Sequence, residues 1–195
     1  MNFLAHAYLS FQHPQVLVGN MISDFVKGSA RYHFPPQIQA GITLHRRIDC
    51  FTDEHPATKE ARTFFRNPYR LYSGPIMDIV YDHFLAGDKS VFKDNELFAF
   101  THTVYATLEQ YAFYLPNRFL LMLPYMKKEN WLFQYQYKEG IGRSLQGLVR
   151  RSSHLSDHTT ALQLLQEHYD ALQQCYTVFF SDVKIFAQQE LAQLV

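Results

Sequence analysis

The sequence has few of the residues that mark several classes of protein. It contains two cysteines, Cys50 and Cys175, and a single tryptophan among 195 residues. Two cysteines this far apart exclude a disulfide framework and a thiolate zinc site, and they favour a reducing compartment. No run approaches 18 uncharged apolar residues, and the first residues lack the basic start and apolar stretch of a signal peptide. We therefore expect a cytoplasmic protein that is not held in a membrane.

An excess of charge of either sign is also lacking. Lys and Arg number 18, Asp and Glu number 18, and the formal net charge is zero. This balance gives no general electrostatic reason to expect a nucleic-acid partner. In contrast, 47% of the residues are hydrophobic, with 17 Phe and 13 Tyr. That composition excludes a disordered chain, collagen and a coiled coil, and it predicts an aromatic-rich core in one domain.

Alternating strand patterns and glycine-serine linkers are missing, whereas prolines precede or open runs in which apolar residues recur at spacings of three and four. Proline in a first helical turn together with this spacing indicates α-helices. We predict an all-α protein, a single-domain compact helical bundle over residues 1–195. The expected helices cover residues 2–11, 14–27, 36–52, 56–66, 75–87, 94–114, 117–127, 129–138, 139–151, 157–177 and 179–193.

One predicted helix has an apolar face that ends in polar residues. Ile38, Ile42, His45 and Asp49 are spaced at i, i+4, i+7 and i+11, which places them on one side of a helix. A buried carboxylate without a partner is so costly that it would neutralise instead. Asp49 therefore needs an arginine, a network of hydrogen bonds or a metal ion.

Three further helices repeat this arrangement. His83 lies on an apolar face with Asp78 and Asp82 beside it, Asp24 follows Asn20 by four residues, and His6 follows Asn2 by four. Histidine and carboxylate sets suit Mn²⁺, Fe²⁺, Zn²⁺ or Mg²⁺ better than thiolate chemistry does. Each residue also has an ordinary structural interpretation, as a core histidine or a helix cap. A shared metal centre is the functional interpretation of the four together.

Basic residues gather in the same half of the chain. Residues 27–70 contain eight cations and four acids, a local net charge of +4. Phosphate or an acidic protein could dock there, and the alternative is an ordinary solvated helix face. The cations are Lys27, Arg31, Arg46, Arg47, Lys59, Arg62, Arg66 and Arg70.

Five motifs stand out in the sequence: MNFLAH at residues 1–6, GNMISDFVKG at 19–28, GITLHRRID at 41–49, FTD at 51–53 and DIVYDHFL at 78–85. In this order and spacing, they resemble the bacterial acyl carrier protein phosphodiesterases. The resemblance covers the whole chain and is densest over residues 1–87. It implies a helical fold like that of the HD superfamily, but this chain has only the reversed dipeptide Asp82-His83. It also implies a divalent metal, typically Mn²⁺, with Mg²⁺, Fe²⁺ and Zn²⁺ as alternatives.

The implied reaction is hydrolysis of the phosphodiester that joins 4′-phosphopantetheine to a serine of holo-acyl carrier protein. A metal held by a subset of the polar residues would activate water and neutralise the phosphoryl oxygens. Lys27, Arg46 or Arg47 would stabilise the transition state, and Asp78 or Asp82 would protonate the departing serine. The candidate ligands are His6, Asp24, His45, Asp49, Asp82 and His83, and the candidate catalytic residues are Asp24, His45, Asp49, Asp78, Asp82, Arg46 and Lys27.

Two other classes of function stay open at this point. An HD-type hydrolase of another small phosphoester would use the same metal but would need no surface for a carrier protein. A non-catalytic module that binds carrier protein would need no metal. Metal content separates the module from both enzymes, and the products formed separate the two enzymes from each other.

Overall fold

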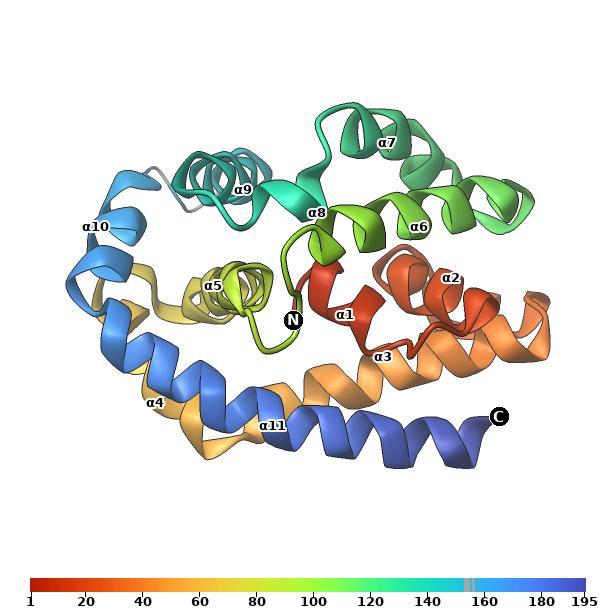
Figure 1. The fold of residues 1–195 in the computed structure, drawn as a ribbon, viewed down its shortest axis with the longest axis horizontal. Coiled ribbons are helices and arrows are strands. Elements are labelled where there is room, and N and C mark those ends of the chain that lie inside the picture. The colour runs from red at the N-terminus through yellow and green to blue at the C-terminus, as the bar shows by residue number, and fades with distance from the viewer. Residues whose placement is uncertain (153–154, 156) are drawn as a thin grey trace.

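The computed structural model describes residues 1–152, 155 and 157–195, and all regular structure in these residues is helical (Figure 1). The predicted all-α class is thereby confirmed. The α-helices are α1 (Phe3–Tyr8), α2 (Pro14–Ile22), α3 (Pro36–Glu54), α4 (Pro56–Tyr69), α5 (Ser73–Gly87), α6 (Glu96–Gln110), α7 (Asn117–Lys128), α8 (Trp131–Gln134), α9 (Lys138–Arg151), α10 (Thr159–Glu167) and α11 (Tyr169–Leu194), and the 3₁₀ turns are η1 (Ser23–Phe25), η2 (Gly28–His33), η3 (Arg70–Tyr72) and η4 (Ala112–Tyr114).

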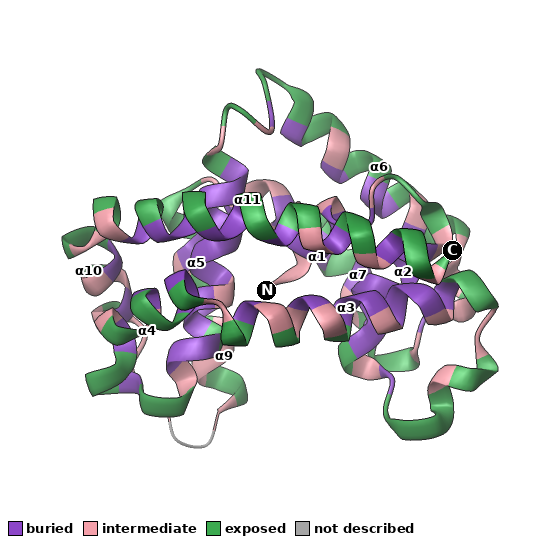
Figure 2. Ribbon diagram, turned by 90° about the horizontal axis from the view of Figure 1, so that it is seen from below, coloured by how far each residue is buried: buried purple, intermediate pink, exposed green. Residues whose placement is uncertain are grey.

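The short helix α1 lies at the centre of the molecule. Figure 1 shows it between α5 and α2, with α6 and α7 on one side and the long pair α3 and α11 on the other. Buried residues line the inward faces of these helices, as Figure 2 shows. The chain's first residues therefore lie in the interior, surrounded by helices that come from distant parts of the sequence.

Two glycines allow α2 and α3 to approach closely. A Cβ atom added to Gly19 would lie 2.0 Å from the carbonyl oxygen of Ile38, and one added to Gly41 would lie 2.1 Å from that of Val16. Any side chain larger than hydrogen would force the helices apart, because interiors are packed too tightly to absorb such an overlap. This contact sets the distance between Asn20 on α2 and His45 on α3.

Several helix ends differ from the sequence prediction. The helix expected over residues 14–27 ends at Ile22, and after η1 the chain is extended at Val26 and Lys27. The helix expected over 2–11 ends at Tyr8, since Phe11 and Gln12 adopt positive φ angles of 48° and 62°. Left-handed residues cannot continue a right-handed helix.

The break between the last two helices also lies at a different residue from the one predicted. The sequence predicts two helices that meet near residue 178, but α11 runs without interruption from Tyr169 to Leu194. The break from α10 falls at His168, whose φ and ψ of −111° and 22° leave the helical region. Among the described residues, no helix has both the length and the apolar character needed to span a bilayer.

Candidate metal centre

Two histidines and one aspartate converge beside α1. Their ligand atoms, on His6 of α1 and His45 and Asp49 of α3, all lie within 4.8 Å of one another. His6 Nε2 is 3.1 Å from Asp49 Oδ1, and His45 Nε2 is 3.1 Å from Asp49 Oδ2. The two imidazole rings stack with their centroids 3.8 Å apart. The i, i+4 spacing of His45 and Asp49 thus places both side chains toward α1.

A second carboxylate borders this group on its open side. Asp24 of η1 places Oδ1 3.3 Å from His45 Nε2, and its side chain is 74% exposed. The side chain of Asp49 is 39% exposed, whereas those of His6 and His45 are almost completely buried. The group is therefore closed behind the imidazoles and open to solvent at the carboxylates.

A backbone carbonyl fixes the orientation of the His45 ring, and two polar side chains hold the backbone of His6 in place. His45 Nδ1 lies 2.8 Å from the carbonyl oxygen of Asn20, so Nδ1–H donates to it and Nε2 faces the carboxylates. The side-chain amide of Asn20 and the hydroxyl of Ser10 each donate a 2.8 Å hydrogen bond to the carbonyl oxygen of His6. The hydrogen bond from His45 Nδ1, the ring nitrogen remote from the carboxylates, is of the kind that typically orients metal-binding histidines.

Several buried polar atoms of the group have no hydrogen-bond partner. They include His6 Nδ1, His45 Nε2 and Asn20 Oδ1. His45 Nε2 lies within ion-pair distance of Asp24 and Asp49 but is not aligned for a hydrogen bond with either. Two imidazoles beside carboxylates form a donor set that suits Mn²⁺, Fe²⁺ or Zn²⁺. The residues present therefore fit a divalent cation.

The amino group of Met1 also contacts the carboxylates. It lies 3.1 Å from Asp49 Oδ1 and 3.0 Å from Asp78 Oδ1 of α5. Burial alone would lower the pKa of this amine, but Asp78 and Asp49 outweigh that effect and raise the pKa to about 11. The two carboxylates thus stabilise a positive charge in the interior, as they would stabilise a metal ion.

The pKa values of the two histidines are shifted in opposite directions. Burial lowers the pKa of His45, but Asp24 and Asp49 more than compensate and bring it to about 9. Burial and the neighbouring charge of His45 lower the pKa of His6 to about 4. Burial would raise the pKa of Asp49, yet the Met1 amine and both histidines hold it well below its usual range. At neutral pH without metal, His45 carries the proton and His6 is neutral.

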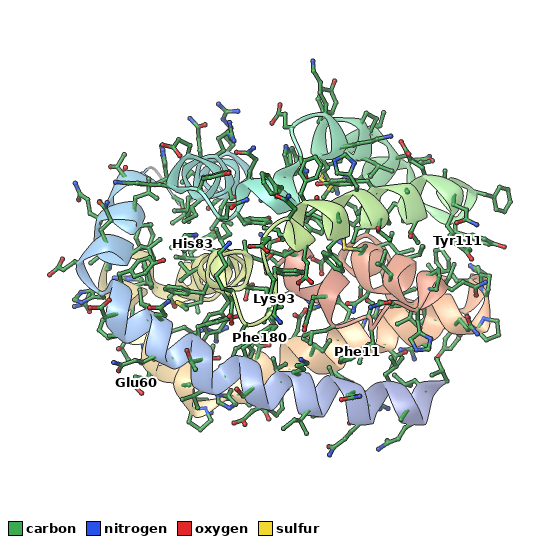
Figure 3. All side chains as sticks on the ribbon, in the orientation of Figure 1. Phe11, Glu60, His83, Lys93, Tyr111 and Phe180 are labelled. Atoms are coloured by element: carbon green, nitrogen blue, oxygen red, sulfur yellow. The ribbon has the colours of Figure 1, made fainter. Side chains whose placement is uncertain are left out.

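Asp82 and His83 lie apart from this group. Both oxygens of Asp82 accept backbone hydrogen bonds, at 2.7 Å from Leu4 N and 3.1 Å from Ala5 N, and so cap the start of α1. Burial raises the pKa of Asp82 to about 7 despite these bonds. His83, labelled on α5 in Figure 3, contacts the carbonyl oxygen of Tyr135 and the hydroxyl of Tyr169. Both residues are thus occupied by contacts that hold the helices together.

The basic residues that the sequence analysis named as candidates have different partners in the structure. Arg46 donates a 2.9 Å hydrogen bond to the carbonyl oxygen of Val26, and Lys27 is exposed just before η2. Arg47 forms an ion pair with Glu190 of α11 instead of turning toward the site. Arg62 donates to Asp53, so only part of the local positive charge stays without an acidic partner.

Sequence reasoning missed two parts of the centre. It noted Asn20 as a polar residue on an apolar face but not the carbonyl oxygen that orients His45. It also gave no role to the amino group of Met1. Backbone groups have no signature of their own in a sequence, although Gly19 and Gly41, both inside predicted helices, were a usable signal of close helix contact.

Comparison with known proteins identifies the family. The family model described as acyl carrier protein phosphodiesterase matches residues 1–183. The chain belongs to the acyl carrier protein phosphodiesterase family. This membership confirms the resemblance seen in the sequence and the prediction of a phosphodiesterase.

Individual relatives cover nearly the whole chain. A Photorhabdus laumondii protein named acyl carrier protein phosphodiesterase is 36% identical over 171 residues, 87% of this chain and 86% of the relative. A Yersinia pestis protein of the same name is 34% identical over 191 residues, 97% of this chain and 99% of the relative. A Salmonella paratyphi A protein, also so named, is 35% identical over 181 residues, 92% of this chain and 94% of the relative. No solved structure matches the chain.

Proposed function

We propose that this chain hydrolyses the phosphodiester between 4′-phosphopantetheine and a serine of holo-acyl carrier protein, with a divalent metal, Mn²⁺ first, as cofactor. The products are apo-acyl carrier protein and 4′-phosphopantetheine. The observation that carries the proposal is the convergence of His6, His45 and Asp49 within 4.8 Å, in a chain that belongs to this family. A module that only binds carrier protein has no use for these buried, costly groups.

His6, His45 and Asp49 are the residues that would hold the metal, with Asp24 as a further ligand at the open edge. A bound divalent cation supplies Lewis-acid activation of water and of the phosphoryl oxygens. The carbonyl oxygen of Asn20 holds the His45 ring so that Nε2 faces the site. This fixed orientation reduces the reorganisation needed when the reaction begins.

Two carboxylates beside His6, His45 and Asp49 have further proposed roles in the reaction. Contact with His45 lowers the pKa of Asp24, so its exposed carboxylate is ionised and can orient the attacking water. Burial raises the pKa of Asp78, which pairs with the Met1 ammonium 3.0 Å away, and this pair is proposed to supply the proton to the departing serine oxygen. Lys27, exposed three residues after Asp24, is the cation proposed to face the phosphoryl oxygens.

The test is incubation of the purified chain with holo-acyl carrier protein, followed by intact mass measurement of the carrier. We expect conversion to the apo form with Mn²⁺, loss of conversion after exhaustive chelation, and recovery when Mn²⁺ is returned. Unchanged turnover in the chelated, metal-free protein would overturn the metal assignment. If nucleotides or other small phosphoesters are cleaved while the carrier is untouched, the carrier-protein assignment is wrong.

A matched pair of variants tests the site itself. Asp49→Asn removes a ligand charge and should abolish both conversion and Mn²⁺ binding. Asp53→Asn makes the same isosteric change one helical turn along α3, at an exposed residue bonded to Arg62. Because exposed ion pairs contribute little, Asp53→Asn should leave both properties near those of the wild type. Equal activity in the two variants would contradict the proposed centre.

A further inference from the structure

A pocket of about 390 Å³ is lined in part by the two residues that follow Asp24. Its volume falls in the range of small-molecule sites in proteins. The only polar side chains among those that line it are His33 and Tyr114. The lining residues come from η1, η2 and the residues next to them on one side, and from η4 and the two residues after it on the other: Phe25, Val26, Ala30, His33, Phe34, Phe113, Tyr114, Leu115 and Pro116.

The chain passes directly from the metal centre to the pocket wall at η1. Asp24 contacts His45, and the next two residues, Phe25 and Val26, already belong to the pocket wall. Arg46, the residue after His45, donates its hydrogen bond to the carbonyl oxygen of Val26 and so ties that wall to α3. The Phe25 ring packs edge-on against Phe119 of α7, 5.3 Å between centroids, which fixes the opposite wall.

We propose that this pocket holds the pantetheine arm of the substrate while its phosphate lies at the metal centre. The inference rests on the proposed function and adds the place where the arm is bound. The first segment of the arm after the phosphate carries a branched dimethyl carbon, and the rest is an extended chain with two amides and a terminal thiol. The pocket wall begins at Phe25, the residue after Asp24, and this is why we assign the pocket to the group attached to the bound phosphate.

The chemistry of the walls fits such an occupant. Aromatic and aliphatic walls gain free energy by covering the methyl and methylene groups of the arm. The imidazole of His33 and the hydroxyl of Tyr114 are the side chains that can pair with its amides. A nucleoside or a second phosphate would need more polar partners or cations than this lining provides.

The test compares the binding of 4′-phosphopantetheine with that of inorganic phosphate by calorimetry. In the wild type the arm should strengthen binding by about 10-fold or more, because each buried methylene contributes about 0.8 kcal/mol. Ala30→Trp fills the pocket from an exposed position and should remove this advantage without changing the affinity for phosphate. Phe113→Ala removes a side chain of the pocket wall that is 92% exposed, so the fold should be kept. This variant should reduce the gain in affinity of 4′-phosphopantetheine over phosphate.

The matched control is Ala106→Trp, the same substitution at another exposed alanine, on α6 and outside the pocket lining. It should bind both ligands as the wild type does, and circular dichroism checks that every variant is folded. If Ala30→Trp and Phe113→Ala keep the full advantage of 4′-phosphopantetheine over phosphate, the pocket is not the arm site. The binding comparison gives this answer even if holo-acyl carrier protein is not hydrolysed, so the two proposals fail separately. Where hydrolysis is seen, Ala30→Trp should raise the KM for holo-carrier protein.

Discussion

Two regions of the molecule hold residues in environments that cost free energy. The first region buries polar residues, and the second exposes apolar ones. Around α1, α2 and α3, polar groups are buried: Asn20 and Ser10 are completely inaccessible, and His6 and His45 nearly so. Along η4 and α7, apolar groups are exposed: Phe113 is 92% and Leu121 74% accessible. Burying a polar group costs free energy unless it finds a partner, whereas exposing an apolar one forgoes burial that would stabilise the fold.

The difference indicates that the first region is suited to catalysis and the second to contact with a ligand. In the first region, packing around fixed carbonyls holds the polar groups in one geometry, as a reaction at phosphorus requires. In the second, Phe113 is free on one side to border a pocket. The first region should therefore be intolerant of small changes and the second tolerant of large ones.

The largest effect should come from a histidine of the buried region. His45→Ala should lower hydrolysis of holo-acyl carrier protein by about 1,000-fold or more, since both an imidazole ligand and its fixed geometry are lost. His102→Ala, at an exposed histidine of α6, should leave the rate unchanged. The measurement is initial rate by intact mass, with Mn²⁺ binding measured in parallel. Similar losses in both variants would remove the distinction between the regions.

The next largest effect concerns helix packing. Gly19→Ala should destabilise the fold by about 3 kcal/mol, because the new Cβ would overlap the carbonyl oxygen of Ile38. Gly87→Ala places the same methyl group in open space at the end of α5 and should be neutral or stabilising by about 0.5 kcal/mol. Urea unfolding of the two variants measures both values. A Gly19→Ala protein as stable as Gly87→Ala would show that α2 and α3 can separate freely.

A smaller effect is the pH dependence of stability in chelator. His45 has a pKa of about 9 in the folded metal-free chain against 6.5 in a model peptide. Its stabilising contribution is therefore complete below pH 6.5 and is lost as the pH rises through 9. The pKa of His6 is lowered to about 4 in the folded chain. Because the unfolded chain binds this proton already near pH 6.5, stability is also lost as the pH falls from 6.5 through 4.

The alkaline loss should amount to about 1–2 kcal/mol after screening by solvent at the partly exposed carboxylates. Urea unfolding between pH 5 and 10 measures it. His45→Gln should reduce the alkaline loss to the part that comes from the Met1 amine, whose pKa is raised to about 11, and should weaken the acidic loss, because His6 no longer has the charge of His45 beside it. An unchanged alkaline slope in that variant would show that His45 is not the group responsible.

The smallest effect is expected on α7. Leu121→Ser should change the free energy of unfolding by no more than about 0.5 kcal/mol, because the leucine is already exposed to water. Thermal and urea unfolding against the wild type measure the change. A loss of several kcal/mol would mean that this face is covered in solution, and the contrast between the two regions would fail.

Much of the fold could be predicted from local patterns. The apolar spacing of three and four and the prolines at helix starts identified most helices, because these signals act within a few turns. The ends were less certain. No proline or glycine stands at the stop at Ile22 or at the break at His168 to mark it in the sequence. The uninterrupted length of α11 reflects its packing along α3 and α4.

The sequence by itself determined which residue types were available for chemistry. The spacing of His45 and Asp49 assigns them to one face of a helix in any fold that keeps that helix, since the period of 3.6 is a property of the backbone. The motifs of the first 87 residues also carried the resemblance to the family that the comparisons confirmed.

Only the tertiary structure decided which candidates meet. Asp82 and His83 also lie on or beside an apolar helix face, as His45 and Asp49 do, yet Asp82 caps the start of α1 and His83 contacts Tyr135 and Tyr169. His6 reaches Asp49 because α1 lies in the centre, 43 residues away in sequence. A helical repeat fixes where a side chain points around its own axis, but the partner it finds depends on how distant helices pack, and that information is not local.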